Sequence, residues 1–140
     1  MSRLTALLIT LWAGSLWTIC GLVAPTLFAV LDDRHAAGQL AATFFFAATV
    51  IGVVIGSVLI AMNLARKVAL PGIAPVIVTA GFPLGSHLIL GPLMDQARAA
   101  GDMSRFGILH GIAGACFLIA CAGAFVLVWK FNRPAERREE

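Results

Sequence analysis

The side chains best suited to bind a ligand are two histidines, His87 and His110, each inside a long apolar stretch. An imidazole can bind a metal or haem or carry a proton, and an ionisable residue at membrane depth is a candidate functional site. Met94 lies between them in the sequence and adds a thioether, so a copper-type site of His87, His110 and Met94 is one hypothesis. Haem ligation is a second. Two histidines are an incomplete site for most metals, so an interhelical hydrogen bond or an interfacial position for each is the third.

No catalytic group accompanies them. Ser57 and Thr49 have no base nearby in the sequence, and the Ser86 and His87 side chains diverge if both lie on one helix. No glycine-rich phosphate loop with its lysine occurs. We therefore expect that the protein is not an enzyme.

The cysteines give no sign of a disulfide framework or a zinc ribbon. They are odd in number, lie in apolar stretches and show no C-x-x-C spacing. We expect Cys20, Cys116 and Cys121 to be small packing residues.

Four apolar stretches must position the histidines. Each is long enough to cross the hydrocarbon core of a bilayer, about 30 Å, as a helix. They cover residues 4–31, 41–65, 73–94 and 106–131. With 60% hydrophobic and 12% charged residues, so short a chain cannot bury its apolar side chains in a soluble core. We predict an all-α, integral membrane four-helix bundle forming one domain over residues 1–131, followed by a polar tail at 132–140. Proline predicts a local break at Pro25, late in the first helix. Breaks are also expected in the third helix, which contains Pro75, Gly81, Pro83 and Gly85, and a kink there would loosen the backbone close to His87.

The charged residues predict the orientation. Seven of the ten Lys and Arg residues lie at the N-terminus, the second joint or the tail, and three in the other two joints. The positive-inside rule then places both termini in the cytoplasm of a cell whose inner (plasma) membrane holds the protein. The lipid bilayer is the expected partner. No basic stripe with interleaved exposed aromatics occurs, so nucleic-acid binding is not expected.

Three pairs of glycines at four-residue spacing predict close helix packing, because transmembrane helices associate through small residues. The pairs are Gly52 and Gly56, Gly81 and Gly85, and Gly107 and Gly111. Packing within one chain is the first interpretation, and under it Gly111→Leu disrupts the bundle. A self-association face of a homo-oligomer is the alternative.

Several motifs resemble those of a known family. Residues 21–28 read Gly-Leu-Val-Ala-Pro-Thr-Leu-Phe, Gly38 and Phe45 follow the first joint, and residues 106–111 read Phe-Gly-Ile-Leu-His-Gly. Together they resemble the domain-of-unknown-function-4149 family, whose eukaryotic relatives are called transmembrane-protein-205-like. The resemblance spans most of the chain and implies a small four-helix membrane protein of unestablished activity. More distantly, the family is similar in fold to copper-resistance D-type proteins and to a haem-dependent bacterial protoporphyrinogen oxidase, and fold alone does not transfer function.

The sequence therefore leaves three functions open. The first is a structural, accessory or stress-tolerance component of the membrane, without a cofactor. The second is a metal- or haem-handling protein that uses His110 and His87. The third is a subunit of a small oligomeric transporter.

Overall fold

A computed structural model describes residues 3–65 and 73–132, and the chain is all-helical over these residues. Four helical spans are long and apolar enough to cross a membrane: Arg3–Val30, Arg34–Leu64, Ala74–Ala99 and Met103–Phe131. Their elements are α1 (Arg3–Thr18), η1 (Ile19–Val23), α2 (Ala24–Val30), α3 (Arg34–Leu64), α4 (Ala74–Gly85), η2 (Ser86–Leu90), α5 (Gly91–Ala99) and α6 (Met103–Asn132). The predicted fold class and the four spans are confirmed. Residues 133–140 of the predicted tail, and Arg66 and Lys67, lie outside the described residues.

Two helix boundaries differ from the prediction by five residues or more, and a third differs less, since α6 begins at Met103 rather than 106. The second span begins at Arg34 rather than 41, because the Asp33 carboxylate caps it and accepts hydrogen bonds from the backbone N–H of His35 (2.8 Å) and Ala36 (3.2 Å). The third span continues to Ala99 rather than 94.

The turn between the last two spans explains why the third ends where it does. Gly101 adopts a positive φ of 72°, which glycine does without strain, and this conformation commonly ends a helix. Asp102 then starts α6, since its carboxylate accepts a hydrogen bond from the backbone N–H of Arg105 (3.0 Å). The joint of this hairpin is therefore only a few residues long.

The first and third spans each contain one π-helical turn, η1 and η2, and each turn is followed by a proline. A proline ring inside a helix clashes with the carbonyl four residues earlier, which is Gly21 for Pro25 and Leu88 for Pro92. Both carbonyls lie within the π turns, whose wider winding accommodates the ring. The predicted break at Pro25 thus takes the form of a π turn. In the third span the π turn at 86–90 contains His87, close to which a kink was predicted, whereas Pro83 itself is within α4.

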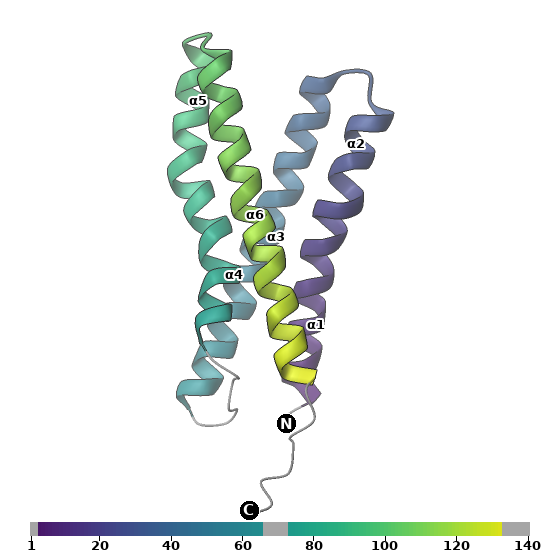
Figure 1. The fold of residues 1–140 in the computed structure, drawn as a ribbon, viewed down its shortest axis with the longest axis vertical. Coiled ribbons are helices and arrows are strands. Elements are labelled where there is room, and N and C mark those ends of the chain that lie inside the picture. The colour runs from purple at the N-terminus through teal and green to yellow at the C-terminus, as the bar shows by residue number, and fades with distance from the viewer. Residues whose placement is uncertain (1–2, 66–72, 133–140) are drawn as a thin grey trace, which may run out of the picture.

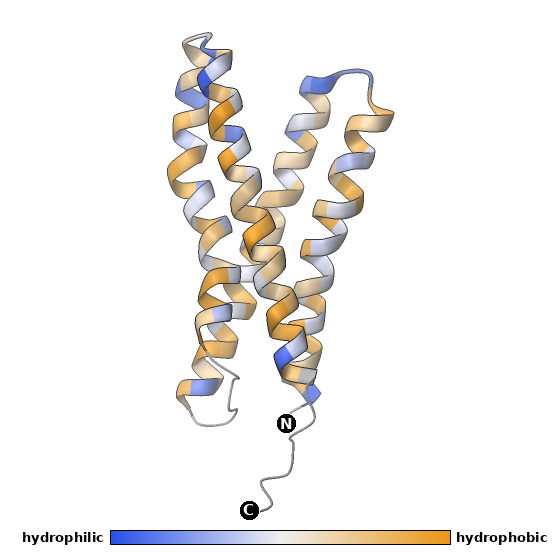
Figure 2. Cartoon of the chain, viewed as in Figure 1, coloured by the Kyte–Doolittle hydropathy of each residue, from blue (hydrophilic) through white to orange (hydrophobic). Residues whose placement is uncertain are grey.

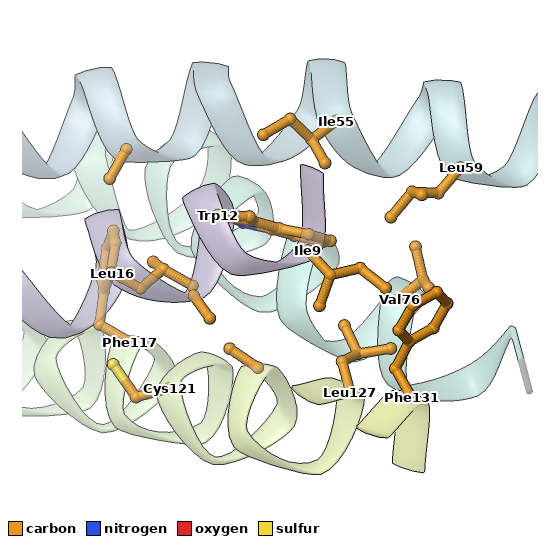
Figure 3. Close-up of a cluster of buried hydrophobic side chains, with 13 residues drawn as sticks. Ile9, Trp12, Leu16, Ile55, Leu59, Val76, Phe117, Cys121, Leu127 and Phe131 are labelled. Carbon is orange, nitrogen blue, oxygen red and sulfur yellow. The ribbon is translucent and has the colours of Figure 1, made fainter. Parts of the chain in front are cut away.

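The main cluster of buried apolar side chains comes from the half of the bundle in which α1 begins and α6 ends, and Figure 1 shows where these helix ends lie. Trp12 is its largest side chain and is 1% exposed. Figure 3 shows the Trp12 indole lying between α3 and α6, with Ile9 and Ile55 beside it. Leu16, Leu59, Val76, Phe117, Cys121, Leu127 and Phe131 belong to the same cluster. All four spans meet here, so this half holds the helices together.

In the other half the helices separate into two hairpins, one of α2 with α3 and one of α5 with α6, which diverge in Figure 1. Polar residues gather at the two ends of the bundle, and apolar residues follow the helices between them (Figure 2). The start of α1, the end of α3, the start of α4 and the end of α6 all lie at one end (Figure 1).

The glycines fall into two groups. A Cβ at Gly52 would lie 2.7 Å from Trp12 Nε1, and a Cβ at Gly56 would lie 3.3 Å from the Ala80 Cβ. These two allow α3 to approach its neighbours. Gly123, not among the predicted positions, is similar, since a Cβ there would meet the Thr79 hydroxyl.

The remaining predicted glycines do not pack helices within the chain. A Cβ on any of them would meet nothing within 4 Å: Gly81, Gly85, Gly107 and Gly111. Packing within one chain was therefore the wrong interpretation for these four, because the four-residue spacing does not say which face of a helix meets a neighbour. Self-association through them stays a prediction.

Candidate functional site

A cavity of about 310 Å³ lies between the two diverging hairpins. All four spans contribute to its wall, through α2, α3, η2, α5 and α6. The wall is mostly apolar, with aromatic side chains from Phe28, Phe45, Phe46 and Phe117. The cavity is open to its surroundings, since Phe46, His87 and His110 are exposed. A cleft of this size with few polar groups is typical of a site for a small ligand.

Both predicted histidines line this cavity, and so does Met94. His87 lies in η2, His110 in α6 and Met94 in α5, so all three belong to one hairpin. The π turn that contains His87 therefore decides where its side chain points along the third span. The three side chains that the sequence singled out for a soft-metal site therefore line the same cavity.

Aromatic rings, rather than hydrogen bonds, support the two imidazoles. The His87 ring lies 4.8 Å from the Phe46 ring, centroid to centroid, across the cavity from α3. The His110 ring stacks on Phe106 at 5.8 Å and 16°, and the Arg98 guanidinium lies 4.6 Å from the centroid of the same Phe106 ring. Arg98, Phe106 and His110 thus form a column from the hairpin joint to the cavity, with a cation–π contact at its outer end.

The described residues supply no hydrogen-bond partner for the imidazole nitrogens of His87 or His110, so neither forms the interhelical hydrogen bond that was one hypothesis. The Thr49 side chain of the cavity wall is satisfied within its own helix. The Thr49 hydroxyl donates to the Phe45 carbonyl (2.9 Å), and no buried side-chain N or O atom in the described part of the chain lacks a partner. The two imidazoles are exposed polar groups of the wall that have no hydrogen-bond partner among the described residues.

Within the described ranges, no three His, Cys, Asp or Glu side chains gather closely enough to hold a metal ion. A structural zinc site, which takes four such ligands, is therefore not present there. What the cavity offers instead is two imidazoles and one thioether. His35 is separate from it, in an exposed position where its Nε2 lies 3.1 Å from Gln39 Nε2.

The cysteines lie outside the cavity. Cys20 of the first span and Cys121 of the last are neighbours, and both pack with the core. Cys116 lines a second, apolar groove of about 430 Å³ between α4 and α6, together with Gly81 and Gly85. The contact between Cys20 and Cys121 was not predicted, since residues so far apart in the chain carry no shared spacing.

Sequence reasoning also missed the apolar wall of the cavity. Its α6 side consists of His110, Ala113, Gly114 and Phe117, and its α3 side includes Ala42, Phe45, Phe46 and Thr49. Both sets follow the spacing i, i+3, i+4, i+7, which marks one face of a helix. The spacing of the residues that follow His110 was the signal from which this wall could have been predicted. The spacing does not stand out, because nearly every residue of these helices is apolar.

A comparison with family models matches residues 7–102 to a domain of unknown function, DUF4149. The match covers more than half of the chain and includes His87, whereas α6 with His110 follows its end. Neither the curated proteins nor the solved structures contain a match. The relations to the transmembrane-protein-205-like and copper-resistance D-type proteins stay predictions.

Proposed function

We propose a function for this chain on the premise that it belongs to the DUF4149 family, a domain of unknown function. The chain is a multi-pass membrane protein that acts without catalysis of its own, as an accessory component of the membrane. Its working part is the cavity between the two hairpins, which holds a small ligand.

The observation that carries the proposal is the contrast between the two halves of the bundle. One half is filled by Trp12 and its neighbours, while the other contains a cavity with two imidazoles that have no hydrogen-bond partner among the described residues. Both imidazoles are exposed in the open cavity, and where such a group faces lipid rather than water the missing partner costs about 1–3 kcal/mol. A bundle with only a structural role gains nothing from such a cost, and a bound ligand removes it.

Filling the cavity tests the proposal. We expect native mass spectrometry of the detergent-purified protein to show mass above that of the bare chain, and Ala42→Trp to abolish this excess. Ala42 lines the cavity on α3, so an indole there occupies the ligand's space. Ala47→Trp, also exposed on α3 but outside the cavity, is the matched control and retains the excess.

Bound lipids on the outer surface persist in both variants and are thereby separated from the ligand. The proposal is contradicted if the wild-type protein shows only the mass of the bare chain under all conditions used to release it from detergent in the mass spectrometer. A defined ring of cross-linked subunits would instead support the oligomeric transporter.

We further propose that the protein lies in the inner (plasma) membrane with both termini in the cytoplasm. The surplus of Lys and Arg at the N-terminus, second joint and tail supports this orientation. So does the position of the start of α1 and the end of α6 at one end of the bundle (Figure 1). A reporter that is active only in the cytoplasm should be active when fused before Met1 and when fused after Glu140. It should be silent when inserted at Gly101, and activity there together with silence at either terminus would reverse the orientation.

A further inference from the structure

We propose that the ligand of the cavity is a single monovalent soft metal ion, of the Cu(I) type, bound by the imidazoles of His87 and His110 and the thioether of Met94. The inference rests on the proposed function, since it names the chemistry of the ligand in the same cavity.

The donor set selects the class of ion. Imidazole and thioether are nitrogen and sulfur ligands, and thioether sulfur in particular favours Cu(I) over harder ions. Calcium and magnesium require several oxygen ligands, and no carboxylate lines the cavity. Zinc sites hold three or four protein ligands, and no three His, Cys, Asp or Glu side chains gather within the described parts of the chain.

The charge balance selects a monovalent ion. His87, His110 and Met94 are neutral as ligands, so the bound site carries the full charge of the metal. The cost of placing an ion in an apolar medium rises with the square of its charge, and no carboxylate in the wall offsets it. Aromatic faces contribute a smaller stabilisation of a single positive charge, and four phenylalanines line the cavity.

The three donors share one cavity wall and one hairpin. All three belong to the third and fourth spans, whose short joint at Gly101 and Asp102 makes them one hairpin. The phenylalanine contacts hold each ring without engaging its nitrogens: Phe46 lies against His87, and Phe106 lies against His110. The imidazoles are held in place by groups that do not compete with a metal.

Titration of the full-length protein in detergent with Cu(I), under anaerobic conditions and against a competing Cu(I) chelator, tests the inference. We expect one ion per wild-type chain. His87→Ala and His110→Ala should each weaken binding by about tenfold or more, because even loss of an outer-shell group costs roughly 10–100-fold. His35→Ala and Met62→Leu remove the same donor types outside the cavity and should leave binding unchanged.

Two readouts distinguish this site from copper bound elsewhere on the chain. X-ray absorption at the copper edge should show sulfur and nitrogen neighbours in the wild type, and the sulfur should be lost in Met94→Leu. The thiols could also bind Cu(I), so the combined variant Cys20→Ala, Cys116→Ala and Cys121→Ala should keep the full stoichiometry. Unchanged thermal unfolding of the histidine variants in the absence of metal excludes a folding defect.

Binding that disappears in the cysteine-free variant, or that survives both histidine substitutions, overturns the inference. A different ligand would also overturn the inference while leaving the proposed function standing. In that case the excess mass is organic or shows a haem Soret band, is not removed by the chelator, and is lost in Ala42→Trp. If the wild-type protein shows only the mass of the bare chain and binds no copper, both the inference and the proposed function are contradicted.

Discussion

Gly52→Leu is expected to destroy the folded bundle, so that the variant unfolds or aggregates on extraction into detergent. A Cβ at residue 52 would lie 2.7 Å from Trp12 Nε1, closer than real Cβ contacts come, and 3.3 Å from its Cε2, which is also tight. Trp12 is 1% exposed and held on all sides, so the indole has no space into which to move. Overpacking a core costs about 1–3 kcal/mol for extra methylenes, and a whole leucine side chain against a rigid ring lies at or above the top of that range. The thermal unfolding midpoint and the monodispersity of the purified variant measure the effect.

Gly111→Leu is the matched control. It makes the same change in a transmembrane helix and the same gain in helix propensity, but a Cβ at residue 111 meets nothing within 4 Å. We expect its unfolding midpoint to equal that of the wild type, which reverses the expectation drawn from glycine spacing alone. The double variant Gly52→Leu with Trp12→Ala should recover part of the lost stability, since the two sites are in contact and their effects are not additive. Equal loss in Gly52→Leu and Gly111→Leu would show that helix α3 does not pack on Trp12 in this way.

Trp12→Ala is expected to lower the free energy of unfolding by about 3 kcal/mol, near the lower end of the range for removing a buried tryptophan. The lower end applies because transmembrane helices associate through van der Waals packing rather than through the hydrophobic effect, so the lost transfer term is small. What is lost is contact with the residues around the indole, among them Ile9 and Ile55 (Figure 3). Reversible unfolding in mixed micelles with increasing denaturing detergent measures the change.

Trp17→Ala provides the comparison for this experiment. Trp17 lies on the same helix α1, but it is 52% exposed and faces away from the core. Its removal should change the free energy of unfolding by a small fraction of the Trp12 effect. Similar losses for Trp12 and Trp17 would mean that both indoles act through lipid contact, and the core as described would then be wrong.

The number and type of the helices could be predicted because hydrophobicity over about 20 residues is a strong signal that needs no tertiary information. Their ends were harder to predict. Asp33 and Asp102 each cap a helix. Their charge assigns them to the joints between apolar stretches, so the sequence pattern does not show that they start helices. Asp95 and Arg98 were likewise assigned to a joint, yet they lie on α5 because Gly101 is where the chain can reverse.

The candidate site was partly predictable for a similar reason. His87 and His110 stand out in apolar helices, and the hairpin that joins them follows from chain order. The cavity itself depends on how far the two hairpins diverge, which is a property of all four spans together. Glycine spacing failed for the same cause: Gly52 faces Trp12 and Gly111 faces nothing, and only the packed structure distinguishes them.

The paired wide turns η1 and η2 have a consequence for how the lining of this bundle changes over evolution. A π turn places about one more residue in a helical turn than an α turn does, and one residue corresponds to roughly 100° of rotation. The extra residue is absorbed within the turn, so loss of a single codon in η1 or η2 would leave an α-helix whose side chains beyond the turn keep nearly their present direction. The same loss in an α-helical segment would rotate those side chains by about 100°. The residues that keep their place would include Met94 in the third span and Phe28 in the first. The two π turns are therefore positions at which one residue can be lost without changing which side chains beyond them line the cavity.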